Sequence, residues 1–148
     1  MSYIAHLAKR FVSSWSRKDV SEDELNMVRS TLTASEFILW NQFGIADRRH
    51  SVEVAQRFAV FLPEASRERR AGVLLHDIGK VQSNLSTLMR VIATLVGPRT
   101  KRFALYHQHE KIGIIMLRHA GSHPDVIAVL NQTCGAEVAT AFRSADNI

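Results

Sequence analysis

The sequence predicts an all-α domain, and three observations support this prediction. Apolar residues recur at intervals of three and four along most of the chain, which is the period of an amphipathic helix. No segment shows the sustained alternation of apolar and polar residues that a half-buried strand would require. Only three prolines occur in 148 residues, so few positions interrupt a helix. We expect a single compact helical bundle without linkers or internal repeats.

The first 45 residues predict three helices. In the first, apolar residues occupy every fourth position, at Tyr3, Leu7, Phe11 and Trp15. Two later segments have the pattern of a capping box, in which a hydroxyl residue and a glutamate three positions on each bond the other's backbone N–H. These segments are Ser21-Glu22-Asp23-Glu24 and Thr33-Ala34-Ser35-Glu36. Gly44 is the expected stop of the third helix. We interpret 1–45 as N-terminal helices that pack on the core formed by 46–148.

Helix signals continue through the middle of the chain. Asp47 is the expected cap of a helix that Pro63 ends. Ser66 is the expected cap of the next helix, which carries the pair His76-Asp77 and finishes at Gly79. Further helices are predicted over 84–96, 107–119, 124–131 and 136–145.

The amino-acid composition is that of an ordinary globular protein. The apolar share of 46% and the charged share of 22% argue against a disordered chain. The longest apolar stretches are far shorter than a membrane span, and no signal-type apolar block follows Met1. One cysteine, Cys134, excludes an intrachain disulfide and fits a reducing compartment. We expect a cytoplasmic protein that does not contact a membrane.

The positive charge of the chain favours anionic partners. The formal net charge is +5 and the sequence pI is about 9.9. Basic residues cluster at 48–49, 67–70 and 99–102, but Phe103 is the only aromatic residue beside them, which argues against nucleic acid. The expected partner is a phosphorylated small molecule or a nucleotide, and this prediction leaves the oligomeric state open.

Candidate metal ligands occur at three places in the sequence. They are His50, the pair His76-Asp77, and Asp146 near the chain end. Two imidazoles and two carboxylates suit a divalent ion that keeps open positions for water and substrate. Adjacent helical residues point about 100° apart, so His76 and Asp77 can face one ion at a helix end, where Gly79 would let the backbone open. We expect His50 in the first turn of its helix and Asp146 in the last turn of its own.

The order of these residues resembles the HD-domain superfamily of metal-dependent phosphohydrolases, over about Ala46 to Asp146. The segment Ile78-Gly79-Lys80 resembles its HDIG subgroup in particular. The resemblance implies that His50, His76, Asp77 and Asp146 bind the catalytic metal. Manganese, iron, magnesium, zinc, cobalt and nickel all suit such mixed ligation.

The same resemblance implies that this chain lacks part of the residue set for a second metal site. The segment from His109 to Gly113 resembles the family's downstream His-x-x-x-Gly element, whose histidine serves a second metal or the phosphate. Two-metal relatives then carry one or two histidines followed by glycine, where this chain has Asn131-Gln132-Thr133-Cys134-Gly135. We therefore expect one metal ion and at most a weak second, with Cys134 as an alternative ligand.

These observations predict a metal-dependent phosphohydrolase that cleaves a phosphomonoester or phosphodiester, and a nucleotide in particular. Metal-activated water would attack the phosphorus next to Asp77, Lys80 would contact the phosphate as a point charge, and His109 would assist. The missing imidazole motivates an alternative, a metal-binding nucleotide sensor or scaffold with little turnover. A third hypothesis, nucleic-acid binding through the basic clusters, predicts affinity that falls steeply with salt.

Overall fold

The regular structure is entirely helical wherever the computed structural model describes the chain, which is at residues 18–83, 97, 101, 104 and 108–147. The elements are α2 (Glu22–Thr31), α3 (Ala34–Trp40), α4 (Ile45–Phe61), α5 (Arg67–Leu74), the 3₁₀-helix η1 (Ile78–Ser83), α8 (His109–His119), α9 (Pro124–Leu130) and α10 (Ala136–Asp146). The prediction of an all-α fold is confirmed. The helices predicted over 3–15 and 84–96 lie outside the described residues.

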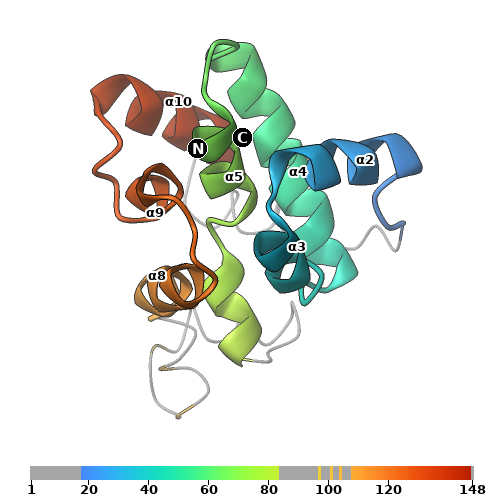
Figure 1. Ribbon diagram of the computed structural model, residues 1–148, viewed down its shortest axis with the longest axis vertical. Helices are drawn as coiled ribbons and strands as arrows, with labels where there is room; N and C mark the ends of the chain where they lie inside the picture. The colour runs from blue at the N-terminus through green and yellow to red at the C-terminus, as the bar shows by residue number, and fades with distance from the viewer. Residues whose placement is uncertain (1–17, 84–96, 98–100, 102–103, 105–107, 148) are drawn as a thin grey trace.

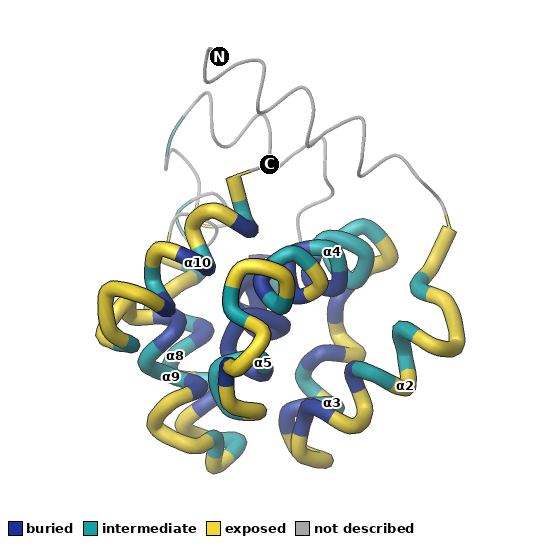
Figure 2. Tube along the Cα trace, turned by 90° about the horizontal axis from the view of Figure 1, so that it is seen from above, coloured by how far each residue is buried: buried dark blue, intermediate teal, exposed yellow. Residues whose placement is uncertain are grey.

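Helices α4 and α5 occupy the middle of the bundle (Figure 1). Helices α2 and α3 lie on one side of this pair, and α8, α9 and α10 lie on the other. The buried positions face the interior between these groups (Figure 2). One cluster of buried apolar side chains includes residues from every described helix, among them Val28 of α2 and Trp40 of α3. Each large side chain buried this way contributes roughly 1.5–3 kcal/mol, so packing holds these short helices together.

The two predicted capping boxes are confirmed. In the first, the Ser21 N–H donates to Glu24 Oε2 at 2.7 Å, and the Glu24 N–H donates to Ser21 Oγ at 3.3 Å. Thr33 and Glu36 exchange the same two bonds at 2.9 and 3.3 Å. Each box satisfies two backbone donors that the first turn of a helix leaves open, and it therefore sets where α2 and α3 begin.

Helix α4 begins earlier than the sequence predicted. Gly44, the expected stop of α3, is the N-cap of α4, and Asp47, the expected cap, lies inside the first turn. An acidic side chain in that turn still stabilises the helix through its dipole, which explains why Asp47 resembled a cap. As a consequence, His50 lies in the second turn of α4 and not in the first. The predicted end before Pro63 is confirmed, with Leu62 as the C-cap.

Helix α5 begins after Ser66 as predicted, but it ends at Leu74. His76 and Asp77 therefore lie in the turn between α5 and η1, and the prediction that a helix carries them to Gly79 is wrong. Gly79 itself is not among the glycines at positive φ. A Cβ on Gly79 would lie 1.7 Å from the His109 carbonyl oxygen, so glycine allows η1 to pack closely on α8. Close packing, and not backbone freedom, explains this glycine.

Helices α8 and α9 end with the same hydrogen-bond pattern. The Ser122 N–H donates to the Leu117 carbonyl and the Thr133 N–H donates to the Ala128 carbonyl, both at 3.0 Å. The residue before each donor adopts a left-handed conformation, with φ of 73° at Gly121 and 59° at Gln132. Glycine is the usual residue there because a Cβ is strained in this conformation, so Gln132 is the exception.

Helix α10 ends at Asp146, one residue beyond the predicted 136–145, and Asp146 lies in its last turn as predicted. No described helix is both long and apolar enough to cross a membrane.

Candidate metal centre

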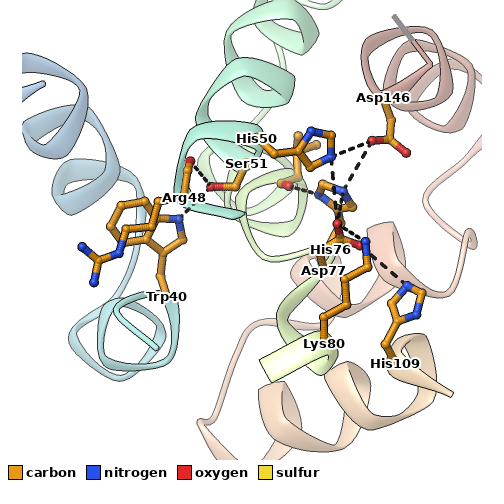
Figure 3. A network of polar contacts seen from close by, with 10 residues as sticks. Trp40, Arg48, His50, Ser51, His76, Asp77, Lys80, His109 and Asp146 are labelled. Carbon is orange, nitrogen blue, oxygen red and sulfur yellow. Dashed lines mark hydrogen bonds and ion pairs between the residues drawn. The ribbon is translucent and has the colours of Figure 1, made fainter. Parts of the chain in front are cut away.

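Three segments that are far apart in the sequence bring the predicted ligands together (Figure 3). His50 comes from α4, His76 and Asp77 from the turn after α5, and Asp146 from the end of α10. His50, His76 and Asp77 each offer a ligand atom, and these atoms all lie within 4.8 Å of one another. We call these three residues the ligand group. Two imidazole nitrogens and a carboxylate oxygen at this spacing could hold a divalent ion.

Asp146 lies beside the ligand group. Its Oδ1 is 3.1 Å from His50 Nε2 and 3.6 Å from His76 Nε2. It therefore contacts both imidazoles, although it does not belong to the set of atoms within 4.8 Å of one another. Its role as a fourth ligand stays a prediction.

The His76 side chain is oriented for metal binding. Its Nδ1–H donates to the Val73 carbonyl at 2.7 Å, and because a carbonyl only accepts, this bond places the proton on Nδ1. Nε2 then faces the carboxylates of Asp77 and Asp146 at 3.5 and 3.6 Å. This buried nitrogen makes no hydrogen bond to any described residue. In the neutral ring the Nε2 lone pair faces these carboxylate oxygens, which is unfavourable, and a bound proton or metal cation would satisfy all three atoms.

Aromatic contacts restrain the same ring. Phe142 of α10 packs edge-on against His76, with ring centroids 5.1 Å apart. His50 makes a similar contact at 5.6 Å. The sequence analysis did not single out Phe142, although one signal was present. Phe142 precedes Asp146 by one helical turn, so both lie on the same face of α10.

Asp77 is the centre of the polar network. Lys80 Nζ lies 2.5 Å from Asp77 Oδ2, and His109 Nε2 lies 3.6 Å from Oδ1. Burial alone would raise the pKa of Asp77, but the Lys80 ammonium and then the imidazoles outweigh burial and hold this pKa well below its usual range. Asp77 is therefore a carboxylate at neutral pH, as a metal ligand must be.

Lys80 and His109 lie at the site, as predicted. The Lys80 side chain is only 12% exposed, so it is not a solvated cation at a helix end. His109 is the first residue of α8, and the tight packing of Gly79 on α8 brings it towards Asp77. His107 lies outside the described residues.

A cavity of about 400 Å³ opens next to the ligand group. Its lining includes His76, Asp77, Lys80, His109 and Asp146. The other polar residues on its wall are Glu110, Gln132, Arg143 and Asn147. Cys134, weighed as an alternative ligand, is not among the lining residues of the described chain. The cavity gives a ligand access to the ligand group.

Two basic residues next to His50 bind other parts of the protein. Arg48 Nη1 lies 3.1 Å from Asp19 Oδ2, and Arg49 Nη1 lies 2.8 Å from Glu24 Oε2. The Trp40 Nε1–H also donates to Ser51 Oγ at 3.0 Å (Figure 3). These contacts tie the segment that carries His50 to the N-terminal helices.

The pKa of His76 predicts how metal affinity depends on pH. Burial disfavours the imidazolium, but the carboxylates of Asp77 and Asp146 outweigh burial and raise the pKa of His76 above its ordinary value. In the metal-free protein His76 therefore keeps its second proton to a higher pH than a free histidine does. A metal must displace this proton, so Mn²⁺ affinity is expected to rise between about pH 6 and pH 8, by up to about tenfold per pH unit for each proton released. Calorimetric titration at several pH values measures this slope.

A matched variant controls for histidines elsewhere. His119→Gln changes an exposed histidine at the end of α8 and should keep the same slope. A Mn²⁺ affinity that does not change over this pH range would contradict proton competition at His76.

Comparisons with protein-family models, with curated proteins and with solved structures find no match to this chain. Its function must therefore be inferred from the site itself.

Proposed function

We propose that this protein is a metal-dependent phosphohydrolase that cleaves a phosphomonoester or phosphodiester, a nucleotide in particular. The observation that supports this most is the ligand group, which lies beside a cavity and includes a buried His76 Nε2 without a hydrogen bond to any described residue. The order of the ligands and the Ile78-Gly79-Lys80 segment, which resemble HDIG-type HD domains, support the same class.

The residues present fit a divalent ion. His50, His76 and Asp77 would hold it, with Asp146 as the fourth ligand. When bound, such an ion supplies a Lewis acid for the phosphoryl group and makes water more acidic. Manganese, iron, magnesium, zinc, cobalt and nickel all accept this mixture of nitrogen and oxygen ligands.

Lys80 and His109 would act on the substrate. An ammonium group carries three donors, so contact with Asp77 and contact with a phosphate oxygen are compatible in Lys80. Charge that builds on the phosphate oxygens during transfer is stabilised by such a fixed cation. His109 lies on the other oxygen of Asp77 and lines the cavity, where its imidazole would hydrogen-bond the phosphate or the leaving oxygen.

Hydrolysis by metal-depleted and metal-reloaded protein tests this proposal. The substrates are p-nitrophenyl phosphate, bis(p-nitrophenyl) phosphate, nucleoside monophosphates and cyclic nucleotides. We expect that a chelator removes all activity and that one of the six metals restores it, because without the ion the nucleophile is bulk water. Protein that binds metal but hydrolyses none of these compounds would contradict the proposal.

The second candidate is a metal-binding nucleotide sensor or scaffold with little turnover. Gln132 favours it, because this amide lines the cavity in the segment where two-metal relatives carry an imidazole. The same substrate panel separates the two candidates. A sensor would bind a nucleotide tightly and return it intact with every metal, whereas rapid turnover of any of these compounds would exclude it.

A further inference from the structure

Four polar residues on the cavity wall have no part in the hydrolysis proposed above: Glu110, Gln132, Arg143 and Asn147. The two that bear on anion binding are Arg143 of α10 and Gln132, which follows α9. One carries a positive charge and the other an amide, and both types of group commonly bind anions.

Arg143 lies close to Asp146, the predicted fourth ligand, along helix α10. It precedes Asp146 by three residues, so the two side chains lie on the same face of α10 and both line the cavity. Within the described part of the chain, its guanidinium forms no ion pair or hydrogen bond. Arg48 and Arg49, by contrast, are held by carboxylates of the N-terminal segment. Arg143 is therefore available to an anionic ligand that enters the cavity.

The charges on the wall favour a phosphomonoester over a phosphodiester. Besides Asp77 and Asp146, whose carboxylates would balance a divalent ion, the wall carries two cations that could pair with both charges of a monoester, Lys80 and Arg143, and one carboxylate, Glu110. A phosphomonoester carries about 1.5 to 2 negative charges near neutral pH, whereas a diester carries only one. Glu110 is also on the wall, and its carboxylate would repel a phosphate but accept a hydrogen bond from a hydroxyl group.

Gln132 adopts a backbone conformation that glycine adopts more easily. Its φ is 59°, and the equivalent position after α8 is Gly121. Non-glycine residues in such conformations are strained and cluster at ligand sites, where the side chain has a use. Here the side chain lines the cavity, and its amide can donate to a phosphate oxygen.

We propose that the cavity binds a phosphomonoester whose phosphate is held by Lys80, Arg143 and the Gln132 amide. This inference deepens the proposed function and rests on it. The cavity, at about 400 Å³, lies within the range of ligand pockets, which span roughly 300–1,000 Å³, and so has room for a monoester of about the size of a mononucleotide.

Calorimetric binding to the Mn²⁺-loaded full chain tests the role of Arg143. The probes are methyl phosphate, a monoester, and dimethyl phosphate, a diester. Arg143→Gln is expected to weaken methyl phosphate binding about tenfold or more, because it removes a charge-assisted hydrogen bond. The matched control is Arg118→Gln, which removes an exposed arginine outside the cavity wall and should change binding less than about twofold.

Equal affinity of Arg143→Gln and the wild type for methyl phosphate would overturn the inference. Dimethyl phosphate binding as tightly as methyl phosphate, or no methyl phosphate binding by the wild type, would overturn it too. Metal-dependent hydrolysis is measured separately. If the wild type binds methyl phosphate more tightly than dimethyl phosphate but hydrolyses no substrate, only the proposed function is contradicted. If the wild type hydrolyses a substrate but Arg143→Gln binds methyl phosphate normally, only this inference is contradicted.

Gln132→Gly provides a readout that a purely structural role would not produce. It should raise the melting temperature by about 4 °C, because glycine adopts the left-handed conformation without strain. It should also weaken methyl phosphate binding about threefold or more, because the hydrogen bond from the amide to the anionic phosphate is lost. Higher stability with unchanged binding would mean that Gln132 does not contact the phosphate.

Discussion

Asp77→Asn is expected to abolish both metal binding and phosphohydrolase activity. The change keeps the shape of the side chain but removes the charge that faces Lys80 and the two imidazoles of the ligand group. The metal loses an anionic ligand, and Lys80, which is 12% exposed, loses its carboxylate partner. We expect Mn²⁺ affinity to fall by more than about a hundredfold, because even partners outside the first coordination sphere contribute tenfold to a hundredfold. Elemental analysis of the purified variant and calorimetric Mn²⁺ titration measure this loss.

Asp23→Asn is the matched control. Asp23 is an exposed residue in the first turn of α2, so its variant has the same change in charge away from the site. It should retain full metal content and activity. Circular dichroism establishes that the Asp77 variant is folded before its metal content is compared. A folded Asp77→Asn protein with a full complement of metal would exclude Asp77 as a ligand.

Gly79→Ala is expected to destabilise the fold by about 3 kcal/mol or more, at the upper end of the usual cost of overpacking. A Cβ at this position would lie 1.7 Å from the His109 carbonyl oxygen and 2.7 Å from the Gly113 nitrogen. These are backbone atoms, so no side-chain rotation relieves the clash, and η1 and α8 must separate. Urea unfolding measures the loss as a lower midpoint. Separation would also move His109 away from Asp77.

Gly44→Ala serves as the comparison. No heavy atom lies within 4 Å of a Cβ at Gly44, so only the small N-cap preference for glycine over alanine is lost. This variant should stay within about 1 kcal/mol of the wild type. Similar unfolding midpoints for the two variants would show that the contact between η1 and α8 adapts to a methyl group at little cost.

Short-range signals in the sequence were sufficient to predict several helix starts. The boxes at Ser21 and Thr33 and the cap at Ser66 are hydrogen bonds between residues at most three positions apart. Such bonds depend on local chemistry and not on the rest of the fold, which is why the residue pattern predicted them. The period of the apolar residues predicted the helical class for the same reason.

Predictions that depended on neighbouring elements were less successful. Asp47 has the chemistry of a cap, but α4 extends back to Gly44. Gly79 was predicted to end a helix and let the backbone open, yet what requires glycine is the approach of α8, which is distant in the chain. The packing of η1 on α8 is therefore not a property of the residues next to Gly79 in the sequence.

The sequence by itself determined the helical class, several helix starts and the residue types that could bind a metal, because these follow from local hydrogen bonding, periodicity and side-chain chemistry. Only the tertiary structure decided which atoms meet. It brings His50 to Asp146, leaves His76 Nε2 facing two carboxylates, and puts Arg143 and Gln132 on the same cavity wall. The physical reason is that these positions depend on how α4, α5, α9 and α10 pack around a shared core. Such packing brings together residues that are far apart in the chain, and their separation in the sequence does not predict their distance in space.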